Sequence, residues 1–115
     1  MKLTDYIISF DEKTIDAIEK MQIFRTRDLL VQKNNKIIGT ISEGDILRSL
    51  LKNKDLRNKI EDYANLNFKF IKIGDEKKAS EIFIKERIFI VPVFDKKFNL
   101  VNIITLKNFL DGFKK

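Results

Sequence analysis

The sequence predicts a mixed α/β fold of the α+β kind, built from two copies of one unit. The order of apolar runs and polar turns in the first half of the chain recurs in the second. Within each copy, runs typical of strands alternate with stripes typical of helices, in the order strand, helix, strand, strand, helix. Neither copy alone has enough apolar surface to close a core. We therefore expect the two to pack sheet to sheet, with the helices outside, as a single module over residues 1–115.

A hairpin followed by a helix is the clearest part of the repeat. In the first copy, residues 30–31 and 37–41 flank the polar turn 33–36, and a helix opens at Ser42. In the second copy, strands at 90–94 and 100–104 flank the turn 95–98, and a helix opens at Thr105. The copies align without a gap at the spacing that separates Ser42 from Thr105. Apolar stripes predict one buried face on each helix: Ile46, Leu47, Leu50 and Leu51 before Asn53 ends the first, and Leu106, Phe109, Leu110 and Phe113 in the second.

A shorter amphipathic helix precedes each hairpin. Its apolar residues are Ile15, Ala17, Ile18 and Met21 in the first copy and Ala79, Ile82 and Phe83 in the second. Strand-like runs at 7–10 and 68–73 come before these helices, and the lead-ins Asp5-Tyr6 and Asp62-Tyr63 also recur. Leu56, Ile60 and Tyr63 predict a short helix within the connecting segment 53–67. The first repeat thus covers about residues 3–53 and the second about residues 60–115.

Composition narrows the function. The chain of 115 residues is 43% hydrophobic and 35% charged, which is typical of a soluble globular domain. It contains neither Cys nor His, so disulfides, thiolate metal sites and His-based catalysis are excluded. Catalysis by a carboxylate, Lys or Tyr stays open, but no residues converge on such a site. We expect no enzymatic activity and no metal site.

Charge and hydropathy give two further expectations. The net charge of +6 is compatible with an anionic partner, but the lysines are scattered among acidic residues without a basic run. A solvated surface explains that pattern as well. No apolar stretch is long enough to span a membrane, and Ser9 interrupts the first apolar run where a signal peptide would need continuity. We therefore expect a cytoplasmic location.

One segment carries a family resemblance. The sequence Gly39-Thr40-Ile41-Ser42-Glu43-Gly44-Asp45-Ile46 resembles the signature of the CBS repeat, in which a glycine and a β-strand lead to a hydroxyl residue and an Asp at the head of a helix. Residues 42–51 are similar to the CBS pair that precedes the catalytic domain of some bacterial sugar-nucleotidyltransferases. The resemblance implies a tandem CBS pair, acting as a regulatory module at the N-terminus of a larger enzyme and forming a homodimer.

The resemblance also implies a ligand and its contacts. AMP, ADP, ATP or an S-adenosylmethionine-like molecule would bind between the repeats, with no cofactor required. Asp45 would bind the ribose hydroxyls, and Ser42 would support the ribose or phosphate. An ionised carboxylate accepts hydrogen bonds from two vicinal hydroxyls, and a helix N-terminus offers N–H groups to an anion. The alternative is that Ser42 and Asp45 form a capping box and nothing more.

The second repeat departs from the signature. Asn102 and Asn108 stand where the first repeat has Gly39 and Asp45, whereas Thr105 keeps the hydroxyl of Ser42. An uncharged amide is a poorer partner for a ribose diol than a carboxylate. We expect the second site to be weak or empty.

Other candidate contacts have equally plain structural explanations. Arg25, Arg27, Arg48 and Lys107 are candidates for the phosphate, or else ordinary exposed cations. Ile7 and Ile8 could flank an adenine, or else belong to the core. Two other hypotheses remain: a CBS-fold dimerisation scaffold that binds no nucleotide, and a basic nucleic-acid-binding domain, which only the net charge suggests.

Overall fold

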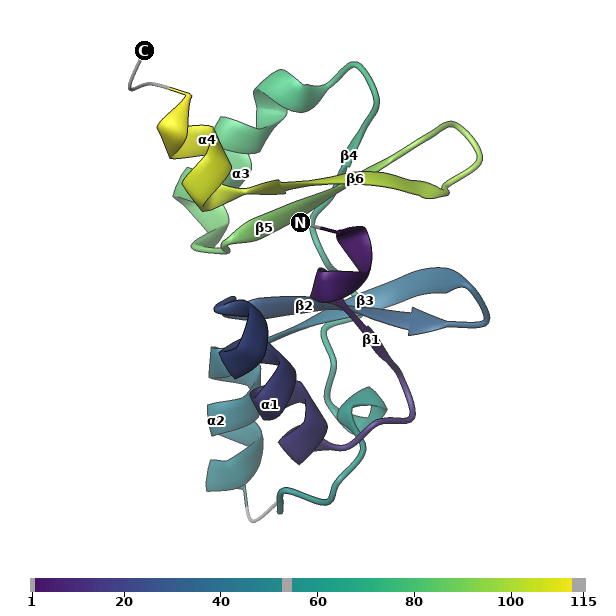
Figure 1. Cartoon of the computed structure of the whole chain (residues 1–115), viewed down its shortest axis with the longest axis vertical. Helices are drawn as coiled ribbons and strands as arrows, with labels where there is room; N and C mark the ends of the chain where they lie inside the picture. The colour runs from purple at the N-terminus through teal and green to yellow at the C-terminus, as the bar shows by residue number, and fades with distance from the viewer. Residues whose placement is uncertain (1, 53–54, 113–115) are drawn as a thin grey trace. The chain divides into compact units, whose positions relative to one another are not determined.

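The computed structural model describes residues 2–52 and 55–112. The chain divides into two compact units, Met1–Phe68 and Lys69–Lys115, and each is considered by itself. Each unit contains a three-stranded sheet and two α-helices (Figure 1). The mixed α/β fold and the duplication predicted from the sequence are confirmed. Packing of the two sheets against each other stays a prediction.

The first unit follows the predicted element order. Its helices and strands are β1 (Ile7–Ser9), α1 (Thr14–Phe24), β2 (Asp28–Lys33), β3 (Lys36–Ser42) and α2 (Glu43–Leu51). β2 lies in the middle of the sheet, parallel to β1 and antiparallel to β3. Asn34 and Asn35 both have positive φ, 52° and 64°, which is the conformation that a two-residue hairpin turn requires and that Asn tolerates.

Helices α1 and α2 cover one face of this sheet (Figure 1). The core between them joins all five elements; its buried residues are Ile8, Ala17, Met21, Leu29, Val31, Ile41 and Ile46, together with Ile60 from the connecting segment. Leu29, Val31 and Ile41 have no solvent-exposed surface. Leu29 and Val31 share one face of β2 because residues two apart on a strand point to the same side, and this is the face that packs against the helices.

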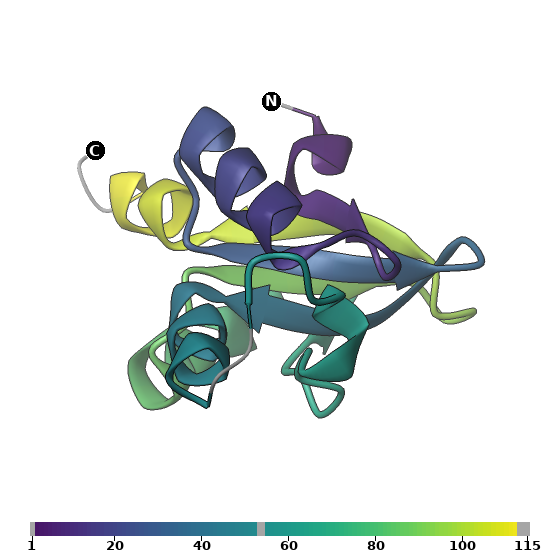
Figure 2. The same cartoon turned by 90° about the horizontal axis from the view of Figure 1, so that it is seen from below.

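The connecting segment packs along the first unit and forms backbone hydrogen bonds with it (Figure 2). It contains a 3₁₀ helix at Ile60–Asp62, shorter than the predicted helix, and part of the predicted segment lies outside the described residues. Asn65 exchanges backbone hydrogen bonds of 2.9 and 2.8 Å with Thr40 on the outer edge of β3. A Cβ atom on Gly39 would lie 2.7 Å from the Asn65 carbonyl oxygen, so the close approach of this segment requires glycine at position 39.

The second unit repeats the plan on a smaller scale. Its elements are β4 (Ile71–Lys72), α3 (Ala79–Glu86), β5 (Ile90–Phe94), β6 (Leu100–Thr105) and α4 (Leu106–Asp111). β5 is the middle strand, parallel to β4 and antiparallel to β6. Pro92 lies in this strand one residue before the pairing with β4 begins, so its missing N–H leaves no gap in the β4 ladder.

The core of the second unit is made by α3 and the sheet, with α4 packed at its margin. Its buried residues are Ile71, Ala79, Phe83, Val91 and Val93, and Leu106 and Phe109 pack against them while half-buried. The rings of Phe83 and Phe109 lie 5.5 Å apart between centroids. The predicted core residues of α3 are thus confirmed.

The apolar stripes on the second helix of each repeat were predicted too wide. Leu47 and Leu51 are 61% and 84% exposed, and Leu110 is 51% exposed. In α2 the small side chain of Ser49 occupies a buried position that the stripe did not include. Helix α4 ends at Asp111 and has only six residues, and Leu106 and Phe109 are the ones that pack against the core. Asn53 and Phe113 lie outside the described residues.

Candidate functional site

The head of α2 brings together the two residues that the signature singles out. Ser42 is the N-cap, and its Oγ accepts a hydrogen bond of 3.1 Å from the backbone N–H of Asp45. The backbone N–H of Ser42 donates to Asp45 Oδ2 at 2.9 Å. This reciprocal pair is a capping box, so the structural role that the sequence allowed is present. It occupies one of the two Asp45 carboxylate oxygens.

The second oxygen of Asp45 binds Arg48 from the next turn of α2. Arg48 Nη2 lies 2.6 Å from Asp45 Oδ1, and the side chains are 66% and 18% exposed. The guanidinium lies over Gly44, where a Cβ atom would be 3.3 Å from Arg48 Nη1. Arg48 therefore folds back toward the helix N-terminus. Because side chains three residues apart on a helix are neighbours, the spacing of Asp45 and Arg48 in the sequence is a signal from which this ion pair could have been predicted.

A polar hollow opens beside Asp45. Its volume is 260 Å³, and its lining combines α2 with the connecting segment: Asp45, Arg48, Ser49, Lys52, Asp62 and Tyr63. Burial raises the pKa of the Tyr63 phenol, a hydrogen bond with Thr14 lowers that pKa, and the Asp45 carboxylate raises it again. Tyr63 is thus close enough to sense the charge of Asp45. From the sequence, Tyr63 was predicted to belong to the connecting segment and to a recurring lead-in, and not to this site.

Arg27 joins the same helix head, whereas Arg25 does not. Arg27 Nε lies 3.4 Å from Glu43 Oε1, and the Arg27 carbonyl accepts a hydrogen bond of 3.0 Å from the Glu43 N–H. Arg25 is the C-cap of α1, with a left-handed φ of 53° and an exposed side chain. Of the two arginines before the hairpin, Arg27 is therefore the one beside Ser42 and Asp45.

Ile7 and Ile8 lie on β1 with different surroundings. Ile8 is buried in the core of the first unit, so its side chain has the structural role that was the alternative to contact with an adenine. Ile7 is half-buried, and its carbonyl accepts a hydrogen bond of 2.5 Å from Lys20 Nζ. Of this pair, only Ile7 keeps a partly exposed side chain.

The head of α4 in the second unit is a simpler version of the same arrangement. Thr105 is the N-cap, and its Oγ1 accepts a hydrogen bond of 3.0 Å from the Asn108 backbone N–H. Asn108 and Lys107 are exposed. The reciprocal hydrogen bond that Asp45 makes in the first unit has no counterpart in the described hydrogen bonds of Asn108.

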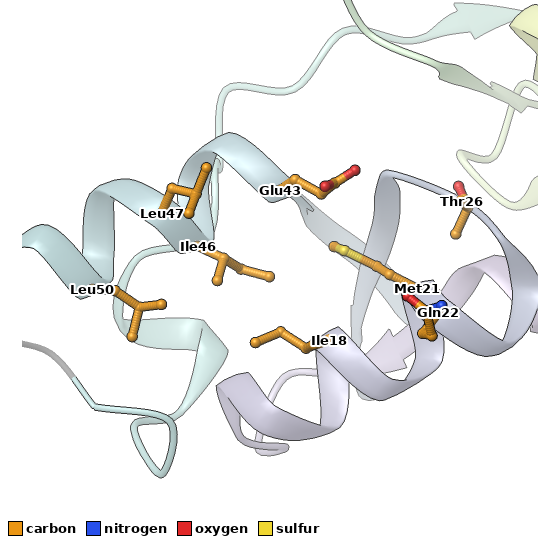
Figure 3. A pocket seen from close by; sticks show the side chains of 8 residues that line it. All are labelled: Ile18, Met21, Gln22, Thr26, Glu43, Ile46, Leu47 and Leu50. Carbon is orange, nitrogen blue, oxygen red and sulfur yellow. The ribbon is translucent and has the colours of Figure 1, made fainter.

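A second depression, apolar in character, lies between α1 and α2. It has a volume of 250 Å³. Figure 3 shows its lining, which comes from both helices and from Thr26 just after α1: Ile18, Met21, Gln22, Thr26, Glu43, Ile46, Leu47 and Leu50. We call it the helix groove. Among the described residues there is no cluster of three acidic side chains able to hold a metal ion.

Comparison with solved structures identifies the fold. A CBS-domain protein from Burkholderia ambifaria superposes with a TM-score of 0.83 at 19% identity, over 95% of this chain and 82% of that one. The chain has the fold of a tandem CBS protein. A CBS domain protein from Pyrobaculum aerophilum, solved with AMP, superposes with a TM-score of 0.75 at 18% identity, over 89% of this chain and 80% of that one.

Comparison of sequences places the family match on the first CBS repeat. The family model of the CBS domain matches residues 4–52, close to the predicted boundaries of the first repeat. An uncharacterized protein of Helicobacter pylori strain J99 is 28% identical over 105 residues, which are 90% of this chain and 31% of that protein. This chain therefore spans about a third of the relative that it matches. None of the helices described is long and apolar enough to cross a membrane.

Proposed function

We propose that this chain is a regulatory CBS module that binds an adenosine nucleotide, with Asp45 on the ribose. The observation that carries the proposal is the head of α2, where a hydroxyl and a carboxylate that is 18% exposed lie at the start of a helix. Arg27 adds a cation beside them, and the polar hollow adjoins Asp45. The AMP complex of the Pyrobaculum protein, which shares the fold, supports this choice of ligand.

The proposal assigns the stronger site to the first repeat. Asp45 carries a charge and can accept two hydrogen bonds from a ribose diol, whereas Asn108 carries none. Thr105 keeps the cap, so α4 retains its start without a carboxylate. ADP, ATP and S-adenosylmethionine share the adenosine group and are the other ligands to be compared with AMP.

Titration calorimetry with AMP tests the proposal. Asp45→Ala should weaken binding about ten- to a hundredfold, because hydrogen bonds to a charged group contribute about 1.5 to 3 kcal/mol. Asn108→Ala is the matched control and should change affinity little. Since Asp45→Ala also removes half of the capping box, its thermal stability without ligand must be measured alongside.

The ligand's own chemistry separates a ribose contact from a loss of structure. Wild type should bind 2′-deoxy-AMP more weakly than AMP, and Asp45→Ala should bind the two alike. Equal discrimination in both proteins would remove Asp45 from the ribose. Absence of AMP binding at millimolar concentration would leave the alternative, a CBS-fold scaffold without nucleotide. That alternative is favoured by one observation, namely that both carboxylate oxygens of Asp45 already have partners.

We also propose that a second copy of the chain covers the helix groove. Leu47 lines the groove and is 61% exposed, and Ile23 and Leu51 on the same two helices are more exposed still. A two-fold partner would present the same apolar face, so that each copy covers the other. Light scattering should give a dimer at tens of micromolar, and Leu47→Lys should give the 13.6 kDa monomer. Ile84→Lys on α3 is the control for an added surface charge; a wild-type monomer would overturn the proposal.

Finally, we propose that the module is the N-terminal part of a larger enzyme such as a sugar-nucleotidyltransferase. The support is the resemblance of residues 42–51 and the greater length of the Helicobacter relative. AMP should then alter the rate of nucleotidyl transfer by the longer protein, and Asp45→Ala should abolish that response. A longer protein without such activity would contradict the assignment.

A further inference from the structure

The carboxylate of Asp45 has two oxygens and two partners inside its own helix. Oδ2 accepts the Ser42 N–H at 2.9 Å, and Oδ1 accepts Arg48 Nη2 at 2.6 Å. A ribose diol that binds Asp45 must therefore replace one of them. We propose that the ribose replaces Arg48, so that this arginine competes with the ligand for Asp45 and lowers the affinity for adenosine. The inference rests on the proposed function.

The two partners of Asp45 are not equally replaceable. The Ser42 N–H belongs to the capping box, and losing its acceptor would leave an orphan donor at the start of α2. Arg48 instead has a side chain that is 66% exposed and can turn into water without leaving a buried group unpaired. Oδ1 is therefore the oxygen that becomes available.

Contacts around Arg48 also allow it to move. Its guanidinium lies over Gly44, which has no side chain to hold it, at a position where a Cβ atom would be 3.3 Å away. An exposed ion pair three residues apart on a helix is weak because water screens it and two side chains must be ordered. Displacement of Arg48 thus lowers affinity by a modest, measurable factor rather than closing the site.

The experiment compares adenosine binding by wild type, Arg48→Gln and Arg57→Gln. Adenosine is neutral, so removing one positive charge from the protein does not by itself change the electrostatic attraction between protein and ligand. Arg57 pairs with Asp55 at 3.5 Å on the exposed connecting segment and provides the matched loss of one charge. Arg48→Gln should bind adenosine about two- to fivefold more tightly, the range that an exposed ion pair contributes. Arg57→Gln should bind as wild type does.

A second ligand and a second substitution check that the gain comes from Asp45. The increase in affinity caused by Arg48→Gln should be smaller for 2′-deoxyadenosine than for adenosine, because 2′-deoxyadenosine has one hydroxyl fewer. In the background of Asp45→Asn, Arg48→Gln should bring no gain. Melting temperatures near that of wild type would show that the variants fold.

Titration of wild type with AMP in the same series separates the two ways of failing. If AMP binds and Arg48→Gln leaves adenosine affinity unchanged, Arg48 does not compete and the inference is wrong while the proposed function stands. If Arg48→Gln weakens both ligands, Arg48 contacts the ligand and the inference is again wrong. If neither AMP nor adenosine binds to any variant, the proposed function and the inference fall together.

Discussion

The N-termini of α2 and α4 are capped by different sets of hydrogen bonds. In the first repeat, Ser42 and Asp45 exchange hydrogen bonds, and the carboxylate also holds Arg48. In the second, Thr105 accepts one hydrogen bond from the Asn108 N–H, and the Asn108 side chain is exposed. Both arrangements start a helix. The first contains two more interactions of the residue-45 side chain than the second has at residue 108, and both depend on the carboxylate of Asp45.

The outer edges of β3 and β6 show a second difference. In the first repeat, the Thr40 N–H donates to Asn65 of the connecting segment, and Gly39 makes room for that segment. In the second, the equivalent Ile103 N–H donates at 2.8 Å to the side chain of Asn102, its own neighbour. Replacing glycine by asparagine thus replaces a docked segment by a local acceptor. The two departures of the second repeat from the signature therefore have separate physical meanings.

The largest effect that we expect concerns the separate core of each repeat. Phe83→Ala should lower the free energy of unfolding by about 3 to 5 kcal/mol, and Met21→Ala on α1 by about 2 to 5 kcal/mol, because each leaves a cavity. Leu110→Ala should cost less than about 1 kcal/mol, since Leu110 is half exposed. Urea unfolding followed by circular dichroism measures all three. A cost for Leu110 equal to that for Phe83 would place the stripe of α4 in the core after all.

The edge difference predicts an intermediate effect. Gly39→Ala should destabilise the protein by about 1 to 3 kcal/mol, because its Cβ meets the Asn65 carbonyl and the segment must shift. Asn102→Ala should change the free energy of unfolding by no more than about 1 kcal/mol, since the Asn102 side chain is exposed and water can take the place of its oxygen. The same urea experiment compares them. If Gly39→Ala were neutral, the docking of the connecting segment would not depend on glycine.

These comparisons also show what sequence patterns could and could not predict. The hairpins, the order of elements and the core residues of α1 and α3 followed from periodicity, because buried strands and amphipathic helices leave that mark. Periodicity also predicted Leu47, Leu51 and Leu110 as buried, and this was wrong: all three are exposed, because helix periodicity predicts an apolar face but not what covers it. The approach of Asn65 to Thr40 is a contact across the sheet edge, which no local pattern contains.

Local sequence patterns also predicted only part of the candidate site at the head of α2. The cap role of Ser42 and Asp45 was one of two readings of a short motif, and the structure contains that cap. The choice between a cap alone and a cap that also binds ribose depends on a ligand, so it stays a prediction. The pairing of Asp45 with Arg48 was open to prediction from their spacing, whereas the nearby Tyr63 was not, since it comes from a different segment.

The smallest effect that we predict is a dependence on pH in the turn of the second hairpin but not in the turn of the first. The first turn uses Asn34 and Asn35, which do not titrate, whereas in the second Asp95 accepts hydrogen bonds from the N–H groups of Lys97 and Asn99 at 2.9 and 2.8 Å. The Asn99 backbone hydrogen bond lowers the pKa of Asp95 most, and the Asn99 side chain and Lys97 lower it further.

A lowered pKa in the folded state means that the folded protein binds the proton less readily than the unfolded chain does. The contribution of Asp95 to stability is therefore present above the ordinary carboxyl pKa and is lost as the pH falls through the lower, folded value. Amide shifts of Lys97 and Asn99, followed by nuclear magnetic resonance, should titrate together below the ordinary Asp midpoint of about 3.9. Those of Asn34 and Asn35 should show no such step, and Asp95→Asn should remove it from the second turn. A midpoint at the ordinary value would mean that the second turn gains nothing from the charge of Asp95, which would leave both hairpins indifferent to pH.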